Sequence, residues 1–313
     1  MMRRLSQAIV IVALSAACSG CFTGIESTPR ITGDDARRAG VVTTAEQTFA
    51  AQLSTERPSQ WREGKRWRVT DDKISLIFTG TPQAGHGLAG SDLTLTGRRD
   101  APTVTGKDVV ELIFTNYKGQ PIAYRTDVPT SEWEQRDNLA VPFAVDLDVV
   151  HRADSLMRGK TFYITTPLWY NKEKKSATGL RHVAVRVDSV TVGDENYPLL
   201  VAFTPTGLGR DVGQWHIFMT YGTARSATRN FDRLFAFDDP RKAFPTINDD
   251  TWQLIIRSRV APGMSRDEAR LALGSPNGID RGTSRGSMQM ERWSYDNGAY
   301  LLFEDGLLVS YRL

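Results

Sequence analysis

Two cysteines, Cys18 and Cys21, have the side chains whose chemistry is easiest to interpret, because a thiol can be acylated, oxidised or bound to a metal. The chain has no further cysteine, so its fold is expected to be stable without a disulfide framework. A Cys-x-x-Cys redox or zinc site needs a folded context. This pair instead follows an apolar run, Ala8 to Ala17, preceded by Arg3 and Arg4. A basic start and a short apolar run are typical of a secretory signal, which favours a thiol modified on export.

The residues before Cys21 indicate which thiol is modified. The segment Cys18-Ser19-Gly20-Cys21 resembles the bacterial lipobox, in which an aliphatic residue, a Ser or Ala and a Gly or Ala precede the cysteine that receives the lipid; Cys18 stands where Leu is commoner. The resemblance implies a signal peptide over residues 1–20 and a lipid on Cys21. Cys18, preceded by Ser15-Ala16-Ala17, is the rival site. An ordinary signal peptide with two incidental cysteines is the remaining alternative.

The residues that follow the cysteine bear on where the protein faces. The signal resembles the Bacteroidetes type of lipoprotein signal, in which acidic residues directly after the cysteine direct export to the surface. Here Phe22 to Glu26 supplies one acid. A lipid-anchored, periplasm-facing protein of the outer membrane is therefore expected rather than a surface-exposed one.

The other residues with reactive side chains lack the spacing of a known site. The histidines show no paired-ligand spacing for zinc, and no Ser lies in a G-x-S-x-G elbow. The acid pairs border predicted strands or helices, where Asp serves as a turn or cap residue. Gly85 to Gly90 matches G-x-G-x-x-G, but a strand follows it where a dinucleotide site needs a helix. We therefore expect no enzyme, metal or cofactor. The histidines are His86, His151, His182 and His216, and the acid pairs are Asp71-Asp72, Asp238-Asp239 and Asp249-Asp250.

The amino-acid composition limits which classes of partner the protein is expected to bind. The formal net charge is +3, of which +1 remains once Arg3 and Arg4 leave with the signal, so there is no bulk attraction to nucleic acid. No long apolar run follows the signal, so the lipid is the expected membrane contact. Residues 21–60 are expected to form a tether with one short helix, because Thr43 and Glu46 have capping-box spacing and Pro58 ends the helical pattern.

From Trp61 to about Phe237 the pattern is mainly β. Short runs rich in Val, Ile, Thr and aromatic residues alternate with Gly, Pro, Asp and Asn, which predicts sandwich or barrel-like modules. The expected strands are Trp67–Thr70, Ile74–Thr79, Leu93–Thr96, Val109–Thr115, Ala140–Val149, Thr161–Thr166, His182–Val192, Leu199–Thr204 and Trp215–Tyr221. Four strand aromatics, Phe162, Tyr163, Trp169 and Tyr170, are expected in a core, with a sugar- or protein-binding surface as the alternative.

Two segments of this region resemble each other, which predicts a duplication. Gly64–Thr70 parallels Gly159–Thr165, and Leu112–Gly119 parallels Leu200–Gly207. Two β-rich modules, residues 61–155 and 156–240, would explain both parallels. The alternative is one continuous sandwich.

The last segment, residues 248–313, carries helix and turn signals that agree with one another. Asn248 or Asp249 can cap a first helix, and Ser265 with Glu268 forms a capping box for a second, which Gly274 is placed to end. Three strands are then expected, joined by Asn297-Gly298 and Asp305-Gly306 turns. The alternating aromatics Trp293, Tyr295, Tyr300 and Phe303 are expected mainly in the core.

At these residues the segment resembles the BamE/SmpA/OmlA family of outer-membrane lipoproteins. The shared pattern is Gly263-Met264, Glu268, Leu273-Gly274-Ser275-Pro276, Trp293-Ser294-Tyr295 and Phe303 to Leu307. The resemblance implies an α+β domain with two helices on a three-stranded antiparallel sheet, and a role beside the outer-membrane assembly machinery.

The combined expectation is a membrane-anchored, non-catalytic lipoprotein that binds an envelope or outer-membrane assembly protein. The alternative is a periplasmic lipoprotein that binds carbohydrate or peptidoglycan through the β-rich modules. A hydrolase whose site is assembled from distant residues is the third hypothesis. No small-molecule ligand is indicated.

Overall fold

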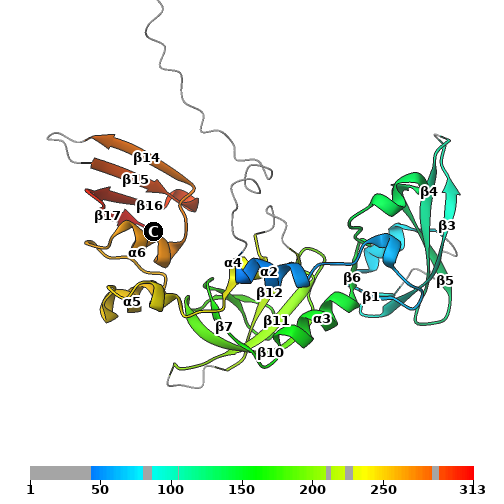
Figure 1. The fold of residues 1–313 in the computed structure, drawn as a ribbon, viewed down its shortest axis with the longest axis horizontal. Coiled ribbons are helices and arrows are strands. Elements are labelled where there is room, and N and C mark those ends of the chain that lie inside the picture. Colours follow the sequence, from blue (N-terminus) through cyan, green and yellow to red (C-terminus); the bar gives the residue numbers. More distant parts are fainter. Residues whose placement is uncertain (1–43, 80–86, 105, 209–212, 223–227, 284–288) are drawn as a thin grey trace, which may run out of the picture. The chain divides into compact units, whose positions relative to one another are not determined.

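Residues 44–313 form a single unit in a computed structural model, and the strands between residues 66 and 146 make one antiparallel sheet (Figure 1). The structure describes residues 44–79, 87–104, 106–208, 213–222, 228–283 and 289–313. The first sheet has the order β2-β5-β4-β3-β1-β6. Its strands are β1 (Arg66–Val69), β2 (Phe78–Thr79), β3 (Asp92–Pro102), β4 (Asp108–Thr115), β5 (Pro121–Pro129) and β6 (Ala144–Asp146). Trp67, Leu93 and Phe114 are among the buried residues of its core.

A second antiparallel sheet follows, with the order β13-β7-β10-β11-β12-β8-β9. Its strands are β7 (Thr161–Ile164), β8 (Leu168–Tyr170), β9 (Ser176–Thr178), β10 (Val183–Val192), β11 (Leu199–Pro205), β12 (Trp215–Met219) and β13 (Phe235–Ala236). Phe162, Val185 and Phe203 are buried in its core. The mainly β class predicted from the strand pattern is confirmed.

The two sheets share a strand order. Read from its other edge, the second sheet has the order β9-β8-β12-β11-β10-β7-β13. In this direction β12-β11-β10-β7-β13 occupies the places that β5-β4-β3-β1-β6 occupies in the first sheet. The irregularities correspond too, because a register shift follows Leu95 in the β3–β4 pair and Val187 in the β10–β11 pair. Gly64 donates its N–H to Leu95 O, and Gly159 donates to Val187 O.

Two helices, α2 (Ala45–Gln52) and α3 (Leu147–Met157), contribute to the core that contains the second sheet. The capping box of α2 is Thr44 with Gln47, one residue later than the predicted pair of Thr43 and Glu46. Phe49, Ala50 and Leu53 are buried, so this part of the predicted tether is packed against the fold.

Two of the strand predictions, Ala140–Val149 and Ile74–Thr79, were wrong in detail. Residues 147–149, expected in a strand, begin α3, because Asp146 accepts a hydrogen bond from Asp148 N and Val149, Val150 and Ala153 share its buried face. Ile74 lies in the 3-10 helix η2 (Asp72–Leu76), and β2 is limited to Phe78–Thr79. Strands β5, β9 and β13 were not expected, and β8 was expected only through the strand aromatics Trp169 and Tyr170. The other short helices are η1 (Pro58–Gln60), η4 (Thr130–Gln135), α4 (Phe231–Leu234), η5 (Pro240–Ala243) and η6 (Asp296–Gly298).

The C-terminal segment consists of two helices and then strands. Helix α5 (Asp249–Ile256) is capped by Asn248, and α6 (Arg266–Leu273) begins with the predicted Ser265–Glu268 capping box. The sheet has four strands, not three: β14 (Gly278–Thr283), β15 (Gln289–Ser294), β16 (Tyr300–Glu304) and β17 (Leu307–Arg312). The unexpected β14 pairs with β15 over six residue pairs, from Gly278–Ser294 to Thr283–Gln289. The expectation of a three-stranded BamE-like domain is therefore not supported.

Within the described ranges, no helix combines the length and apolar character needed to cross a membrane.

Candidate functional site

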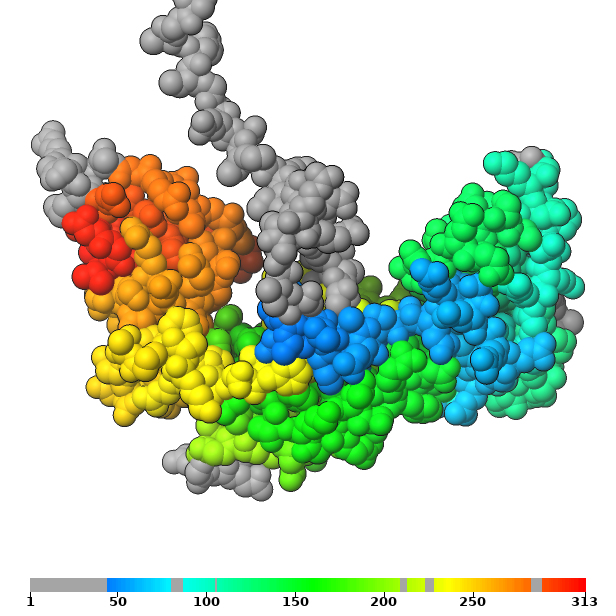
Figure 2. All heavy atoms as spheres, in the orientation of Figure 1, coloured from blue at the N-terminus to red at the C-terminus, as the bar shows by residue number. Residues whose placement is uncertain are grey.

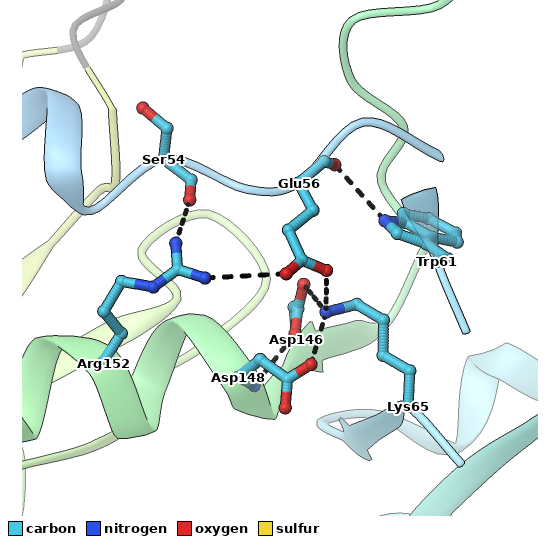
Figure 3. Close-up of polar contacts among 7 residues, drawn as sticks. All are labelled: Ser54, Glu56, Trp61, Lys65, Asp146, Asp148 and Arg152. Atoms are coloured by element: carbon cyan, nitrogen blue, oxygen red, sulfur yellow. Dashed lines mark hydrogen bonds and ion pairs between the residues drawn. The ribbon is translucent and has the colours of Figure 1, made fainter. Parts of the chain in front are cut away.

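A partly buried cluster of charged side chains gathers around Lys65, the residue just before β1 (Figure 3). Asp146 ends β6 on the neighbouring strand, and Asp148 lies in the first turn of α3. Glu56 comes from the segment after α2. Two regions far apart in the sequence, residues 56–65 and 146–148, thus meet at one ammonium group.

Lys65 contacts all three carboxylates. Its Nζ lies 2.6 Å from Asp148 Oδ2, 3.0 Å from Asp146 Oδ2 and 3.5 Å from Glu56 Oε2. The side chains of Lys65 and Asp146 are 3% and 5% exposed, whereas those of Asp148 and Glu56 reach solvent. The ammonium also lies 5.5 Å from the ring centroid of Trp67, within the range of a cation–π contact.

Asp146 has a second role as the helix cap of α3. Its Oδ1 accepts the N–H of Asp148 at 2.9 Å, while Oδ2 has no hydrogen bond of good geometry and faces Lys65 as an ion-pair partner. Burial raises the pKa of Asp146, and Lys65 opposes that shift. Burial by itself would lower the pKa of Lys65, but the Asp148 and Asp146 carboxylates outweigh it and hold the pKa above 10.5.

The cluster extends along the segment after α2. Arg152 on α3 donates from Nη1 to Ser54 O at 2.8 Å, and its Nη2 lies 3.9 Å from Glu56 Oε1. Trp61 donates from Nε1 to Glu56 O at 3.3 Å. These contacts hold residues 54–61 against α3, and the space-filling view shows the two segments in contact (Figure 2).

A polar pocket of about 860 Å³ opens beside the cluster. Glu56, Lys65 and Asp148 form part of its wall, together with Ser59, Gln60, Trp61, Arg62 and Gly64. The ring of Trp61 packs edge-on against Trp67, with centroids 4.9 Å apart, and lies 6.4 Å from the centroid of Trp133. Charged groups, amide groups and one aromatic ring therefore line the same cavity.

The protonation state of Lys65 limits what this pocket can do chemically. A lysine acts as a nucleophile only where its pKa is depressed, and this one stays protonated at neutral pH because its pKa is raised. The arrangement is suited to binding: Asp148 and Glu56 present acceptors, and Ser59, Gln60 and Arg62 present donors.

The sequence-predicted site residues do not converge on this cluster. Cys21 and Cys18 lie outside the described residues, as does His86. His151 is exposed on α3, His182 is partly buried beside Leu271, and His216 lies on β12. Among the residues described, no group of three His, Cys, Asp or Glu side chains is placed to hold a metal ion.

The acid pairs act in turns and caps, as expected. Asp71 accepts from Lys73 N, Asp239 accepts from Arg241 N, and Asp249 lies in the first turn of α5. The strand aromatics are divided: Phe162 and Trp169 are buried, and Tyr163 and Tyr170 are partly exposed.

The C-terminal aromatics follow the same division. Trp293 and Phe303 are buried, whereas Tyr295 and Tyr300 are partly exposed.

No family model, curated protein or solved structure matches the chain. The assignment of residues 248–313 to the BamE/SmpA/OmlA family therefore gains no support from comparison.

The Lys65 cluster was missed because each of its members has an ordinary sequence context. Lys65 appeared only within the parallel between Gly64–Thr70 and Gly159–Thr165. One usable signal was Asp146 directly before Leu147, Val149, Val150 and Ala153, since an Asp ahead of helically spaced apolar residues is an N-cap pattern.

Proposed function

We propose that this chain is a membrane-anchored lipoprotein that works by non-catalytic binding in the bacterial envelope. The observation that carries the proposal is the placement of Ser19-Gly20-Cys21 directly after a basic start and a short apolar run. A diacylated or triacylated cysteine would hold the folded residues 44–313 at a membrane, because several acyl chains together give stable anchoring.

The pocket beside Lys65 is the part of the fold that we propose makes the contact. Its donors and acceptors lie on residues 54–65 and on α3, and the buried ion pairs hold these segments in place. A protein partner in outer-membrane assembly rests on the C-terminal resemblance alone, so the partner's chemistry is the first thing to test.

The anchor is tested by growing cells with an alkyne-bearing palmitate and detecting label on the purified chain. We expect label and membrane fractionation in the wild type and in Cys18→Ser, and loss of both in Cys21→Ser. Label retained in Cys21→Ser and lost in Cys18→Ser would move the anchor to Cys18, and no label in any form would overturn the lipoprotein proposal.

The binding surface is tested by placing a photo-crosslinking amino acid at Gln60, inside the pocket, and at Lys172, in the loop between β8 and β9 as a matched control. We expect an envelope protein to be captured from Gln60 in living cells and not from Lys172. Equal capture at both positions, or none at Gln60, would contradict a protein-binding role for this pocket.

Binding of carbohydrate or peptidoglycan is the second candidate, and the tryptophans favour it. Trp61 lines the pocket, and on its other side a cavity of about 340 Å³ is lined by Trp61, Trp133 and Arg98. Trp133 Nε1 is buried with no hydrogen-bond partner among the described residues. Sedimentation with purified peptidoglycan tests this: a glycan-binding site predicts co-sedimentation that Trp61→Ala abolishes, and wild-type protein left in the supernatant would exclude it.

A further inference from the structure

A separate pocket, of about 420 Å³, lies at the end of the second sheet where β7 finishes. Three arginines line it: Arg181 ahead of β10, Arg229 ahead of α4, and Arg233 within α4. The hydroxyl-bearing residues Thr165 and Thr228 also line it. No described lining residue is acidic, so the pocket gathers positive charge and supplies no carboxylate to balance it.

Arg229 is the most buried of the three, with 9% of its surface exposed. Its guanidinium lies between two rings, 5.4 Å from the centroid of Tyr170 and 4.8 Å from that of Tyr197, and Nη1 donates to Tyr170 Oη at 3.0 Å. No ion pair joins it to a carboxylate in the part of the chain that the structure describes. A buried cation without a counter-ion costs free energy that a bound anion would recover.

The other two arginines complete a positive wall. Arg181 donates to Ser258 Oγ at 3.1 Å and approaches Leu273 O at 3.4 Å, both uncharged acceptors. Burial lowers the pKa of Arg181, and Tyr295 opposes that shift. Arg233 is exposed at the mouth, where its carbonyl accepts a hydrogen bond from Thr165 Oγ1 and its backbone N–H donates to Asn230 O.

The corresponding end of the first sheet has no arginine at the positions of Arg181 and Arg233, although its strands follow the same order. Two backbone hydrogen bonds correspond between the sheets. In the first sheet Thr70 N donates to Phe143 O, and in the second sheet Thr165 N donates to Leu234 O. Likewise Gly90 N donates to Val69 O, and His182 N donates to Ile164 O. Pro142 precedes Phe143 in the first sheet, and Arg233 holds that position before Leu234 in the second. In the same way Ala89 precedes Gly90, and Arg181 precedes His182.

The residue after Thr70 in the first sheet is Asp71, where the second sheet has Thr166. The same strand order thus carries arginines at two positions in the second sheet where the first sheet has Pro142 and Ala89.

We propose that the pocket formed by Arg181, Arg229 and Arg233 binds a phosphate group, either of a phosphate ester in solution or of an anionic phospholipid headgroup. A guanidinium offers several N–H donors in a planar fork that matches phosphate oxygens, and the stacked tyrosines fix the plane of Arg229. The exposed Arg233 is placed to meet the ligand at the mouth. This site is independent of the proposed lipid anchor and of the Lys65 pocket.

The test uses residues 22–313, which lack both cysteines and the apolar run of residues 8–17, so that neither acyl chains nor the signal segment drives membrane binding. Inorganic phosphate is titrated by calorimetry at constant ionic strength, and flotation is measured with vesicles of phosphatidylglycerol and of phosphatidylcholine. We expect saturable binding that weakens at least about tenfold in Arg233→Gln, which removes one charge-assisted contact. Arg229→Lys, which keeps the charge but loses the planar fork, is expected to weaken binding as well.

The matched control is Arg136→Gln, an exposed arginine of the first module whose Nε donates to Asn138 O. Because Arg233 is exposed, Arg233→Gln should keep the thermal midpoint of the wild type while losing the ligand. Phosphate binding that depends on the pocket identifies a soluble phosphate ester, and pocket-dependent flotation with phosphatidylglycerol alone identifies a lipid headgroup. No binding of either probe, or equal losses in Arg233→Gln and Arg136→Gln, would overturn the proposal.

Discussion

Lys65 and Asp146 form an ion pair away from solvent, with Nζ 3.0 Å from Oδ2 and side chains 3% and 5% exposed. Two charges lose most of their hydration here, and their attraction in a low-dielectric setting offsets that loss. The pair joins the start of β1 to the end of β6, and Asp146 in turn caps α3. Removal of the Lys65 charge therefore leaves the Asp146 carboxylate buried without its ion-pair partner.

Lys65→Met is expected to destabilise the fold by about 3–5 kcal/mol, the cost typical of breaking a buried pair from one side. Urea unfolding followed by circular dichroism measures the change. Lys73→Met is the matched control, because Lys73 pairs with Asp71 where both side chains are exposed, and such pairs contribute about 0–1 kcal/mol.

A double-mutant cycle separates the ion pair from the packing of the lysine stem. Lys65→Met combined with Asp146→Asn should be less destabilised than the sum of the single variants, because Asn leaves no buried charge behind. Strict additivity would mean that the two charges do not stabilise each other.

His182 makes the fold sensitive to mild acid. Burial lowers its pKa below 6.5, the nearby Arg181 lowers it further, and a hydrogen bond with Leu271 O opposes both. Below pH 6.5 the unfolded chain binds a proton that the folded chain does not, so the free energy of unfolding falls as the pH falls. We expect the wild type to lose more stability between pH 7 and pH 5 than His182→Asn, measured as urea midpoints.

Asn is the appropriate replacement at this position because His182 has a φ of 54°, a left-handed conformation that Asn tolerates. The same substitution at His151, exposed on α3, serves as the control and should leave the pH dependence of the wild type unchanged. Parallel stability curves for the wild type and His182→Asn would rule out His182 as the titrating group.

Most strands and both C-terminal helices could be predicted from the sequence, and the errors have identifiable causes. Both ends of α6 were predictable because capping depends on a few adjacent residues. Ser265 and Glu268 each accept the other's backbone N–H, and Gly274 ends the helix with a φ of 88°. Residues 147–149 were misassigned because Val149 and Val150 have a high strand propensity. In the structure the burial of Val149, Val150 and Ala153 on one face stabilises a helix instead. Strand β5 was not among the expected strands; it begins and ends with proline, which lacks the N–H that a strand donates to its neighbour.

The candidate sites depend on contacts that local patterns do not encode. Glu56 and Asp148 meet at Lys65 although they are 92 residues apart in the chain, and the three arginines of the second pocket come from separate elements. The parallel between Gly64–Thr70 and Gly159–Thr165 was visible in the sequence, and the strands it contains, β1 and β7, hold corresponding places in their sheets. Origin of the two modules by duplication stays a prediction, supported by that shared strand order.

Tyr295 is expected to ionise late in an alkaline titration. Burial raises its pKa to about 12, with Arg270 and Arg181 opposing the shift, and its hydroxyl donates to Gly274 O at 3.2 Å. Between pH 10 and pH 12 the unfolded chain has lost a phenolic proton that the folded chain keeps, so stability falls as the pH rises. Tyr295→Phe should show a shallower loss over this range and one fewer late-ionising phenol in absorbance at alkaline pH; unchanged titration curves would contradict it.

Gly179 should tolerate no side chain, because a Cβ built there would lie 2.0 Å from Cδ2 of the buried Trp169. We expect Gly179→Ala to lower the free energy of unfolding by about 1–3 kcal/mol, the usual cost of overpacking, and thermal unfolding measures it. Gly278→Ala is the control, since no atom lies within 4 Å of the Cβ position there. Trp169→Leu should reduce the effect of Gly179→Ala, because the smaller side chain removes the clash. An effect of the same size in both backgrounds would place its cause in the backbone of residue 179 rather than in contact with the indole ring.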